Sequence, residues 1–418
     1  MMRILFLAMA LVPAWLMSVQ PAGAQPARRP PPTAPAAEPG GFSLARLLPG
    51  GSAESDAAIA QIEQLGGQHQ IENDAQGNAF RLVTWYAGDE GLEHLHAVRD
   101  LRWLDLSRTN VTDEGLQAVR GLTQLQVLKL QQTRVTDDGL ANLSGLSQLE
   151  GLALHDTKTS ARGLAHLQGL QSLRILNLNW TQTGDEGLAL VARLPQLEEL
   201  YLFDAKVTDE GVAHLAALSE LRALKLSYNR VTDRSLDVLR QLPKLERLWL
   251  DQTQVGDGAL ARVPYMANLR ALALAATQVT DNGLRHLSAA HRLEGLDLSN
   301  LPISDEGLKH LARCGGLRVL LLGGTDVTSD GMPALAQLRG LVQLTLSGTQ
   351  VDSEGLARLA PLSQLAMLDV SQTDVGDGII HVVGNWPQLV RLDVRGTPIS
   401  DAALDELRRT RPQLELVR

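Results

Sequence analysis

A leucine recurs every 24 residues from Leu101 onward, without an insertion, through the 418-residue chain. Thirteen such leucines begin units close to L-x-x-L-x-L-x-x-T-x-V-T-D-x-G-L-x-x-L-x-x-L-x-x, with the first leucine at position one. Another unit starts one period upstream at Gly77, with Phe80 and Leu82 at positions four and six, and "LELVR" closes the chain as a partial unit. A unit this short cannot bury its own apolar stripe, so neighbouring units must stack. The chain is therefore predicted to be a solenoid of about fourteen repeats.

Each position of the unit has a predicted role. At positions four and six, as in Leu200 and Leu202, leucines alternate with polar residues and should point inward from a short strand. The threonine of position nine is expected to bond buried backbone and to form a ladder from unit to unit. Positions twelve and thirteen, as in Thr112 and Asp113, are predicted to start a short helix, with the aspartate acting locally as a cap.

The stack must also bend. Neighbouring strands lie about 4.8 Å apart, whereas packed helices need about 10 Å, so the strands take the inner side of the curve. The predicted fold class is α/β: a leucine-rich repeat solenoid, shaped as a horseshoe or arc, with a parallel concave β-sheet and outer helices. The predicted divisions are a signal peptide (1–24), a proline-rich disordered linker (25–54), an N-terminal cap (55–76), repeats (77–388), and the last repeat with a C-terminal cap (389–418).

The repeat pattern resembles bacterial secreted leucine-rich repeat proteins with a "VTDxGLxxLxxL" unit. It is also similar to the cysteine-containing and ribonuclease-inhibitor-like subclasses, in which strand and helix alternate. The resemblance covers residues 55–418. It implies a protein that binds other proteins, since members of this superfamily mostly do so and a minority bind carbohydrates or lipids.

The first residues predict export. Arg3 precedes an apolar run over 4–19, and Ala22-Gly23-Ala24 offers small residues for cleavage before Gln25. These features are typical of a secretory signal peptide, so the mature chain is expected in the periplasm or outside the cell, without membrane insertion. An uncleaved membrane anchor is the alternative, although the run is shorter than the about 20 residues that a spanning helix needs.

Composition and residue placement argue against several classes of activity. The net charge of −9 disfavours a nucleic-acid or anionic-membrane surface. The single cysteine, Cys314, excludes internal disulfides and thiolate metal clusters, and it stands at a leucine position where a buried thiol is expected. Five of the ten histidines share position eighteen, on the outer side of the helix. No nucleophile–base–acid set stands out, so the chain is predicted to be no enzyme and to have no cofactor or metal.

Positions three, five, seven and eight are predicted to face the concave side. Aromatic and charged residues gather there in consecutive units, whereas beyond Trp249 the same positions are small, as in Ala271 and Gly323. Trp, Tyr and Arg dominate the anchors of protein interfaces, so this stretch is predicted to bind a partner. The predicted patch comprises Trp103, Asn177, Trp180, Glu199, Tyr201, Phe203, Asp204, Lys225, Tyr228, Arg247, Trp249 and Asp251.

Four functions remain open at this point. The favoured one is a non-catalytic secreted scaffold that binds a protein through the concave patch. The same aromatic residues could instead stack on the sugar rings of a glycan. A third function is a structural or adhesion element of the cell envelope, and an enzyme comes last. The aromatic residues could also simply cover one another and stabilise the sheet. The pattern does not define the oligomeric state.

Overall fold

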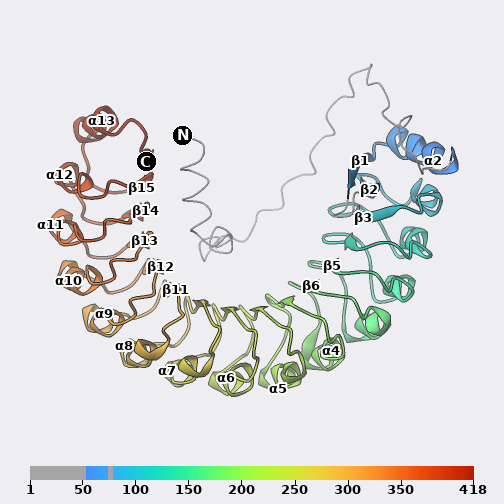
Figure 1. Ribbon diagram of the computed structural model, residues 1–418, viewed down its shortest axis with the longest axis horizontal. Helices are drawn as coiled ribbons and strands as arrows, with labels where there is room; N and C mark the ends of the chain where they lie inside the picture. Colours follow the sequence, from blue (N-terminus) through green and yellow to red (C-terminus); the bar gives the residue numbers. More distant parts are fainter. Residues whose placement is uncertain (1–52, 74–78) are drawn as a thin grey trace.

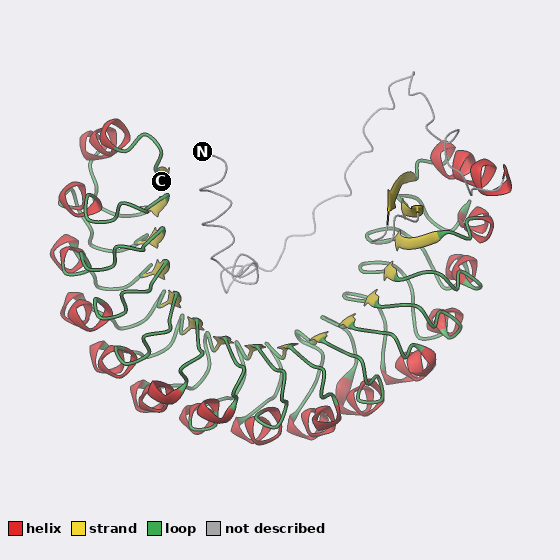
Figure 2. Cartoon of the chain, viewed as in Figure 1, coloured by secondary structure: helices red, strands yellow, loops and turns green. Residues whose placement is uncertain are grey.

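The computed structural model describes residues 53–73 and 79–418. The predicted signal peptide and residues 25–52 of the predicted linker lie outside the described residues. The described chain forms an arc with strands on its inner side and helices on its outer side (Figure 1, Figure 2). The predicted α/β leucine-rich repeat solenoid, with a concave parallel sheet, is therefore confirmed.

One sheet of 16 strands follows the order of the sequence. The first two strands are antiparallel and the others are parallel, each repeat adding one strand beside the previous one. The strands are β1 (Gln68–Asn73), β2 (Ala79–Thr84), β3 (Leu101–Asp105), β4 (Val127–Lys129), β5 (Gly151–Ala153), β6 (Ile175–Asn177), β7 (Glu199–Tyr201), β8 (Ala223–Lys225), β9 (Arg247–Trp249), β10 (Ala271–Ala273), β11 (Gly295–Asp297), β12 (Val319–Leu321), β13 (Gln343–Thr345), β14 (Met367–Asp369), β15 (Arg391–Asp393) and β16 (Glu415–Val417).

Short helices return the chain along the outer side. The α-helices are α2 (Ala53–Gln64), α3 (Ala161–Leu164), α4 (Gly184–Val191), α5 (Asp209–Ala213), α6 (Asp233–Leu239), α7 (Asp257–Leu260), α8 (Asp281–Leu284), α9 (Asp305–Leu311), α10 (Met332–Leu335), α11 (Ser353–Ala357), α12 (Ile379–Val383) and α13 (Asp401–Thr410). The 3-10 helices are η3 (Leu92–Ala97), η4 (Gly115–Val119), η5 (Gly139–Leu143), η6 (Ala165–Gly169), η7 (His214–Ala217), η8 (Val263–Tyr265), η9 (Arg285–Ala289) and η10 (Ser329–Gly331).

A continuous apolar core lies between the sheet and the helices. It runs from Ile59 in α2 to Leu414 before β16, and its leucines at positions four and six are almost completely buried. Leu200 and Leu202, for example, have no exposed surface. The alternation of leucine with polar residues therefore predicted the inward side of the strands correctly.

The strand of the first repeat departs from the predicted register. A bulge between Arg81 and Leu82 shifts the pairing of β2, so that Val83 lies opposite Leu104 of β3. Val83 and Trp85 are fully buried, while Phe80 and Leu82 are only half-buried. The assignment of Phe80 and Leu82 to the inward positions is therefore wrong, because a shift by one residue turns a strand over.

The aspartates of position thirteen join one repeat to the next. The backbone N–H of Thr112 donates to Asp89 Oδ1 at 2.8 Å, and the Thr112 hydroxyl donates to Asp89 Oδ2 at 2.6 Å. The same pair of bonds links Thr136 to Asp113. A Cβ atom on Gly115 would lie 2.1 Å from Asp89 Oδ1, which explains the glycine of position fifteen. The predicted local use of these aspartates is wrong, although the threonines do cap helices.

Three junctions in the described repeats lack this aspartate. At two of them the hydroxyls of Ser329 and Ser353 accept from the next repeat's N–H groups, and the third has no such side chain. The unit at Leu149 has Ala161 at position thirteen, where most other units have aspartate. The backbone N–H of Gly184 in the following unit donates forward to the Ala205 carbonyl of the unit at Leu197. The Gln182 N–H spans the junction, because it donates to the Thr159 carbonyl at 2.9 Å. The junction between the units at Leu149 and Leu173 is therefore held without a carboxylate.

The threonines of position nine act within their own repeat. The Thr109 hydroxyl donates to the Leu106 carbonyl at 2.7 Å, and the threonines at this position in nine further units make the same bond. The predicted ladder from unit to unit is therefore wrong for threonine.

Asn229 is the exception to that rule. Its Oδ1 accepts from the N–H groups of Ala205 (3.1 Å) and Val207 (3.0 Å), and its Nδ2 donates to the Leu202 carbonyl (2.6 Å). Asn229 therefore bonds the backbone of the preceding repeat, whose own position nine is Ala205 and has no hydroxyl.

Candidate functional site

Four rings from four consecutive repeats pack in a row just beyond the carboxyl ends of β5 to β8. The centroids of His155 and Trp180 are 6.3 Å apart, those of Trp180 and Phe203 are 4.9 Å apart, and those of Phe203 and Tyr228 are 4.5 Å apart. We call these four residues the aromatic ladder. Such contacts between rings lie in the range that stabilises aromatic pairs.

The backbone of position eight is left-handed throughout the arc. Trp180 has a φ of 53° and Tyr228 a φ of 63°. Gln132, Gln252 and Gln372 occupy the same position and conformation in other repeats. A bulky side chain with positive φ is a conformational outlier, and such strain collects at functional sites.

The ladder also presents apolar surface to solvent. Trp180 is 45% exposed and Tyr228 is 42% exposed. Ile175, at the start of β6, is 45% exposed and lies in the same repeat as Trp180. These three account for half of the six large exposed hydrophobic residues of the described chain, so the exposure is concentrated here.

A polar cluster lies beside the ladder on β7 to β9. The Tyr201 hydroxyl donates to Glu199 Oε2, and Arg247 Nη2 donates to Glu199 Oε1 at 2.7 Å. Lys225 Nζ lies 5.2 Å from the centroid of the Phe203 ring, which is cation–π geometry and joins this cluster to the ladder. The sequence-predicted residues of β7 to β9 are therefore brought together.

Burial shifts the pKa values of this cluster away from their ordinary range. It raises the pKa of Tyr201, and the bond to Glu199 raises it further. It lowers the pKa of Lys225, against the opposing charge of Asp251. Burial likewise raises the pKa of Asp251, although the Ser227 hydroxyl and the Ala275 N–H both donate to that carboxylate. These groups therefore hold one another in place.

Two predicted anchors do not belong to the exposed surface of the site. Trp249 is only 5% exposed and joins an apolar cluster with Ala223, Ala271 and Ala273. Its ring centroid lies 6.4 Å from that of Tyr201. Trp103 lies on β3, three repeats before β6, with Lys129 Nζ 4.6 Å from its ring centroid. The expectation that both are exposed anchors of one patch is therefore corrected.

The remaining predicted residues shape the backbone around the ladder. Asn177 Oδ1 accepts from the Asn179 N–H at 3.1 Å, and Asn179 Oδ1 accepts from the Phe203 N–H at 2.7 Å. Asp204 forms an ion pair with Lys206, with Nζ and Oδ1 2.6 Å apart. Asn177 is half-buried, and its amide oxygen is used in a turn.

The sequence-based patch also missed two residues of the site. His155 is part of the ladder, and burial lowers the pKa of its imidazole. Its ring at position seven could have been counted with the aromatic residues. Ile175 stands at position three, where its apolar side chain was the available signal.

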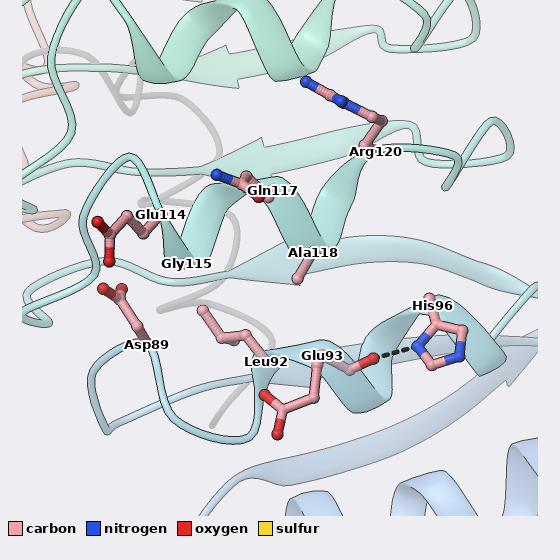
Figure 3. Close-up of a pocket in the computed structure, with 9 residues that line it drawn as sticks. All are labelled: Asp89, Leu92, Glu93, His96, Glu114, Gly115, Gln117, Ala118 and Arg120. Atoms are coloured by element: carbon pink, nitrogen blue, oxygen red, sulfur yellow. Dashed lines mark hydrogen bonds between the residues drawn. The ribbon is translucent and has the colours of Figure 1, made fainter.

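A separate open pocket of about 400 Å³ lies between η3 and η4 on the outer side (Figure 3). Two of the three acidic side chains that line it are already engaged: Asp89 accepts from Thr112, and Glu93 accepts from the Gly91 N–H at 2.9 Å. It contains no residue of the aromatic ladder. We therefore place the candidate site at the ladder, where exposed apolar side chains occupy left-handed positions.

The described residues contain no group of three or more His, Cys, Asp or Glu side chains placed to hold a metal ion. Cys314 is 6% exposed, and burial raises the pKa of its thiol to about 11. Among the helices described between residues 53 and 418, none has the length and apolar character needed to span a bilayer.

Comparison with known proteins supports the fold. A family model described as "Leucine Rich repeat" matches residues 99–119 and 169–192. The chain is similar to an internalin of Listeria monocytogenes, with 22% identity and a TM-score of 0.59 over 87% of this chain and 94% of that one. It is also similar to a leucine-rich repeat protein of Leptospira interrogans, with 20% identity and a TM-score of 0.55 over 78% and 80% of the two chains.

A third similar structure is that of TLR13 in complex with ssRNA13, with 18% identity and a TM-score of 0.50 over 78% of this chain and 57% of that one. At such identities the likeness shows the fold alone. A search of curated proteins finds no match. The chain thus carries leucine-rich repeats, and bacterial leucine-rich repeat proteins are among its structural neighbours.

Proposed function

We propose that this chain is a non-catalytic, exported scaffold that binds a partner protein through the aromatic ladder. The observation that carries the proposal is the left-handed backbone of Trp180 and Tyr228 together with their exposure. A left-handed conformation costs a residue with a side chain roughly 1–2 kcal/mol, and an exposed apolar ring gains little from burial in return. Binding of a partner supplies a reason for keeping these rings at this position.

The arrangement of the rings favours a protein over a glycan. The planes of Trp180 and Phe203 are inclined by 54°, and those of Phe203 and Tyr228 by 36°. Sugar-binding rows present separate, open ring faces, whereas these rings pack against one another. Tyr and Trp in a patch with Arg nearby are typical of protein interfaces.

Export is part of the same proposal, and it rests on the sequence of residues 1–24. The structural relatives include an internalin of Listeria monocytogenes, whose repeats form the same kind of arc. A partner protein would therefore be met in the periplasm or outside the cell.

The test replaces the exposed rings by the residue that sister repeats use. The double variant Trp180→Gln with Tyr228→Gln keeps the left-handed positions occupied as they are in Gln132 and Gln252. Envelope proteins are captured on the immobilised full chain and identified, and the affinity of each captured protein is then measured. We expect at least one protein whose affinity falls about 100-fold in the variant, because two interface anchors are lost.

The control is Gln132→Ala with Gln372→Ala, which changes the same position in repeats outside the ladder. It should leave the affinity within about twofold. A panel of glycans is tested in parallel. Loss of a glycan rather than of any protein would favour the carbohydrate-binding alternative, and equal binding by both variants would rule out the ladder as the site.

A further inference from the structure

Position ten of the repeat lies beside position eight on the same flank of the solenoid. The Lys206 Nζ atom lies 2.6 Å from Asp204 Oδ1, so the side chains of the two positions meet within one repeat. The residues on either side of Lys206, Ala205 and Val207, are fully buried. Position ten is exposed in each of the five repeats from Leu125 to Leu221. Its side chains thus border the aromatic ladder.

This flank is basic only where the ladder lies. Position ten in those five repeats is occupied by Arg134, Lys158, Gln182, Lys206 and Arg230. In the following repeats it is occupied by Gln254, Gln278, Pro302, Asp326, Gln350, Asp374 and Pro398. We call Arg134, Lys158, Lys206 and Arg230 the basic strip. It stands out against a chain whose net charge is −9.

The charge contrast holds when position eight is included. From the repeat at Leu101 to the repeat at Leu221, positions eight and ten hold five cations and two carboxylates, Asp156 and Asp204. From Leu245 to the last full repeat they hold two carboxylates and no cation. Within residues 79–418, Lys206 is paired with Asp204, whereas Arg134, Lys158 and Arg230 form no ion pair with a described residue. Three of the four cations therefore keep their charge available to a ligand.

We propose that the basic strip and the aromatic ladder together bind an extended acidic segment of a partner protein. This inference rests on the proposed function and specifies the partner that the site takes. The cations would pair with the segment's carboxylates, and an apolar side chain of the segment would lie against Trp180 and Tyr228. Opposite charges placed along an interface set specificity and speed association.

The strip is narrow, which favours an extended segment. In three of the five repeats a carboxylate follows four residues further along, at the helix start: Asp138, Glu186 and Glu210. Arg162 and Arg234 take this position in the other two, and Arg162 is paired with Asp138. A duplex nucleic acid or an anionic membrane would also cover these three carboxylates and be repelled by them. Four repeat steps of about 4.8 Å separate Arg134 from Arg230, and about six residues of extended chain span that length.

A random peptide library selected on the immobilised full chain tests the inference. We expect enriched peptides to have a net negative charge and at least one aromatic or aliphatic residue. Their affinity should fall about tenfold in the variant Lys158→Glu with Arg230→Glu, and it should weaken as salt is raised. The control, Gln254→Glu with Gln278→Glu, adds charge at the same position in the next two repeats and should change affinity less than threefold.

The outcomes separate this inference from the proposed function. The inference of an acidic segment would be overturned by three results. These are enrichment of neutral or basic peptides, no enrichment at all, or an equal loss of peptide affinity in the strip variant and its control. Heparin, single-stranded RNA and phosphatidylserine vesicles are tested alongside. Binding of any of them that the Lys158→Glu, Arg230→Glu variant abolishes, without binding of acidic peptides, would also overturn it. If the ladder variant still loses a captured protein while the strip variant does not, the scaffold function stands and only the inference fails.

Discussion

Position eight contrasts the two halves of the arc. Trp180 and Tyr228 take up the left-handed conformation in the half that carries the ladder. In the other half no aromatic residue does so: the residues there are Gln252, Ala276, Asn300, Gly324, Gly348, Gln372 and Gly396. Glycine adopts this conformation without steric cost. The backbone is the same in both halves, so folding alone has no need of an aromatic ring there.

The inner surface shows a second contrast. At position five the ladder repeats include Tyr201 and Lys225, whereas the other half has Ala273 and then the buried carboxylate of Asp297. These different side chains lie on one continuous sheet. Repetition therefore leaves the surface positions free to differ while the core positions stay alike.

The largest effect on stability is expected for Asn229, a single side chain that bonds the backbone of two repeats in the ladder half. Asn229→Ala should lower the free energy of unfolding by about 3–5 kcal/mol, because the N–H groups of Ala205 and Val207 and several carbonyls lose a buried partner. Urea unfolding followed by circular dichroism measures it. Thr325→Ala, which removes one bond to the Leu322 carbonyl in the other half, should cost only about 1–2 kcal/mol. Equal losses would mean that Asn229 does not serve two repeats.

Asp297→Asn should stabilise the other half at neutral pH. Burial, with the nearby charge of Asp251, raises the pKa of Asp297 to about 6 from 3.8. The folded chain therefore binds a proton more tightly than the unfolded chain, so the free energy of unfolding falls as pH rises from about 4 to about 6. The variant, which cannot ionise, should be more stable by about 2–3 kcal/mol at pH 7.5 and lose this advantage near pH 4.

Thermal and urea unfolding at the two pH values would check the Asp297 prediction. Asp369→Asn, at the same repeat position but only half-buried, controls for the change in the turn, since both aspartates accept from the N–H two residues on. A gain that is the same at pH 4 and pH 7.5 would show that ionisation of Asp297 is not its cause.

An aromatic ring placed at position eight of the other half should destabilise the fold through backbone strain, without contributing to binding. Gly348→Trp keeps a φ of 66° and has only ordinary contacts around the new Cβ, so we expect a loss of about 1–2 kcal/mol. Gln372→Trp is the matched control, because a residue with a side chain is already left-handed there. If both variants lose the same free energy, conformational strain is not what distinguishes the two halves.

The smallest effect on stability is expected within the ladder. Trp180→Gly relieves the left-handed strain but removes ring contacts with His155 and Phe203 that are worth about 1 kcal/mol, so the net change should stay within about 1 kcal/mol. Binding of the partner should nevertheless be lost. A loss of stability above about 3 kcal/mol would instead support a purely structural role, in which the rings stabilise the sheet by packing against one another.

The repeat made most of the fold predictable. Leucine spacing identified the inward positions of the strands, and Thr208 caps its helix as expected, since its hydroxyl accepts from the Glu210 N–H. What the spacing could not show is the partner of a side chain. Asp185 and Thr208 are 23 residues apart yet directly bonded, because stacking brings successive repeats together.

The candidate site was predictable only in its location. Residues that share a face could be read from alternation, and Tyr201, Phe203 and Tyr228 do lie together. Exposure could not be read in this way, because it depends on neighbours in adjacent strands, as the burial of Trp249 shows. The bulge in β2 was equally hidden, since Phe80 and Leu82 fit the period while their strand is shifted.

The missing carboxylate between the units at Leu149 and Leu173 has a mechanical consequence. Without a side-chain bond from position thirteen, this junction is held by backbone bonds such as that from the Gln182 N–H to the Thr159 carbonyl, so an arc loaded at its ends would flex more readily here. The rings of His155 and Trp180 straddle that same junction. A partner bound across both rings would restrain bending at this junction. Binding at the ladder would therefore reduce the relative motion of the two ends of the arc.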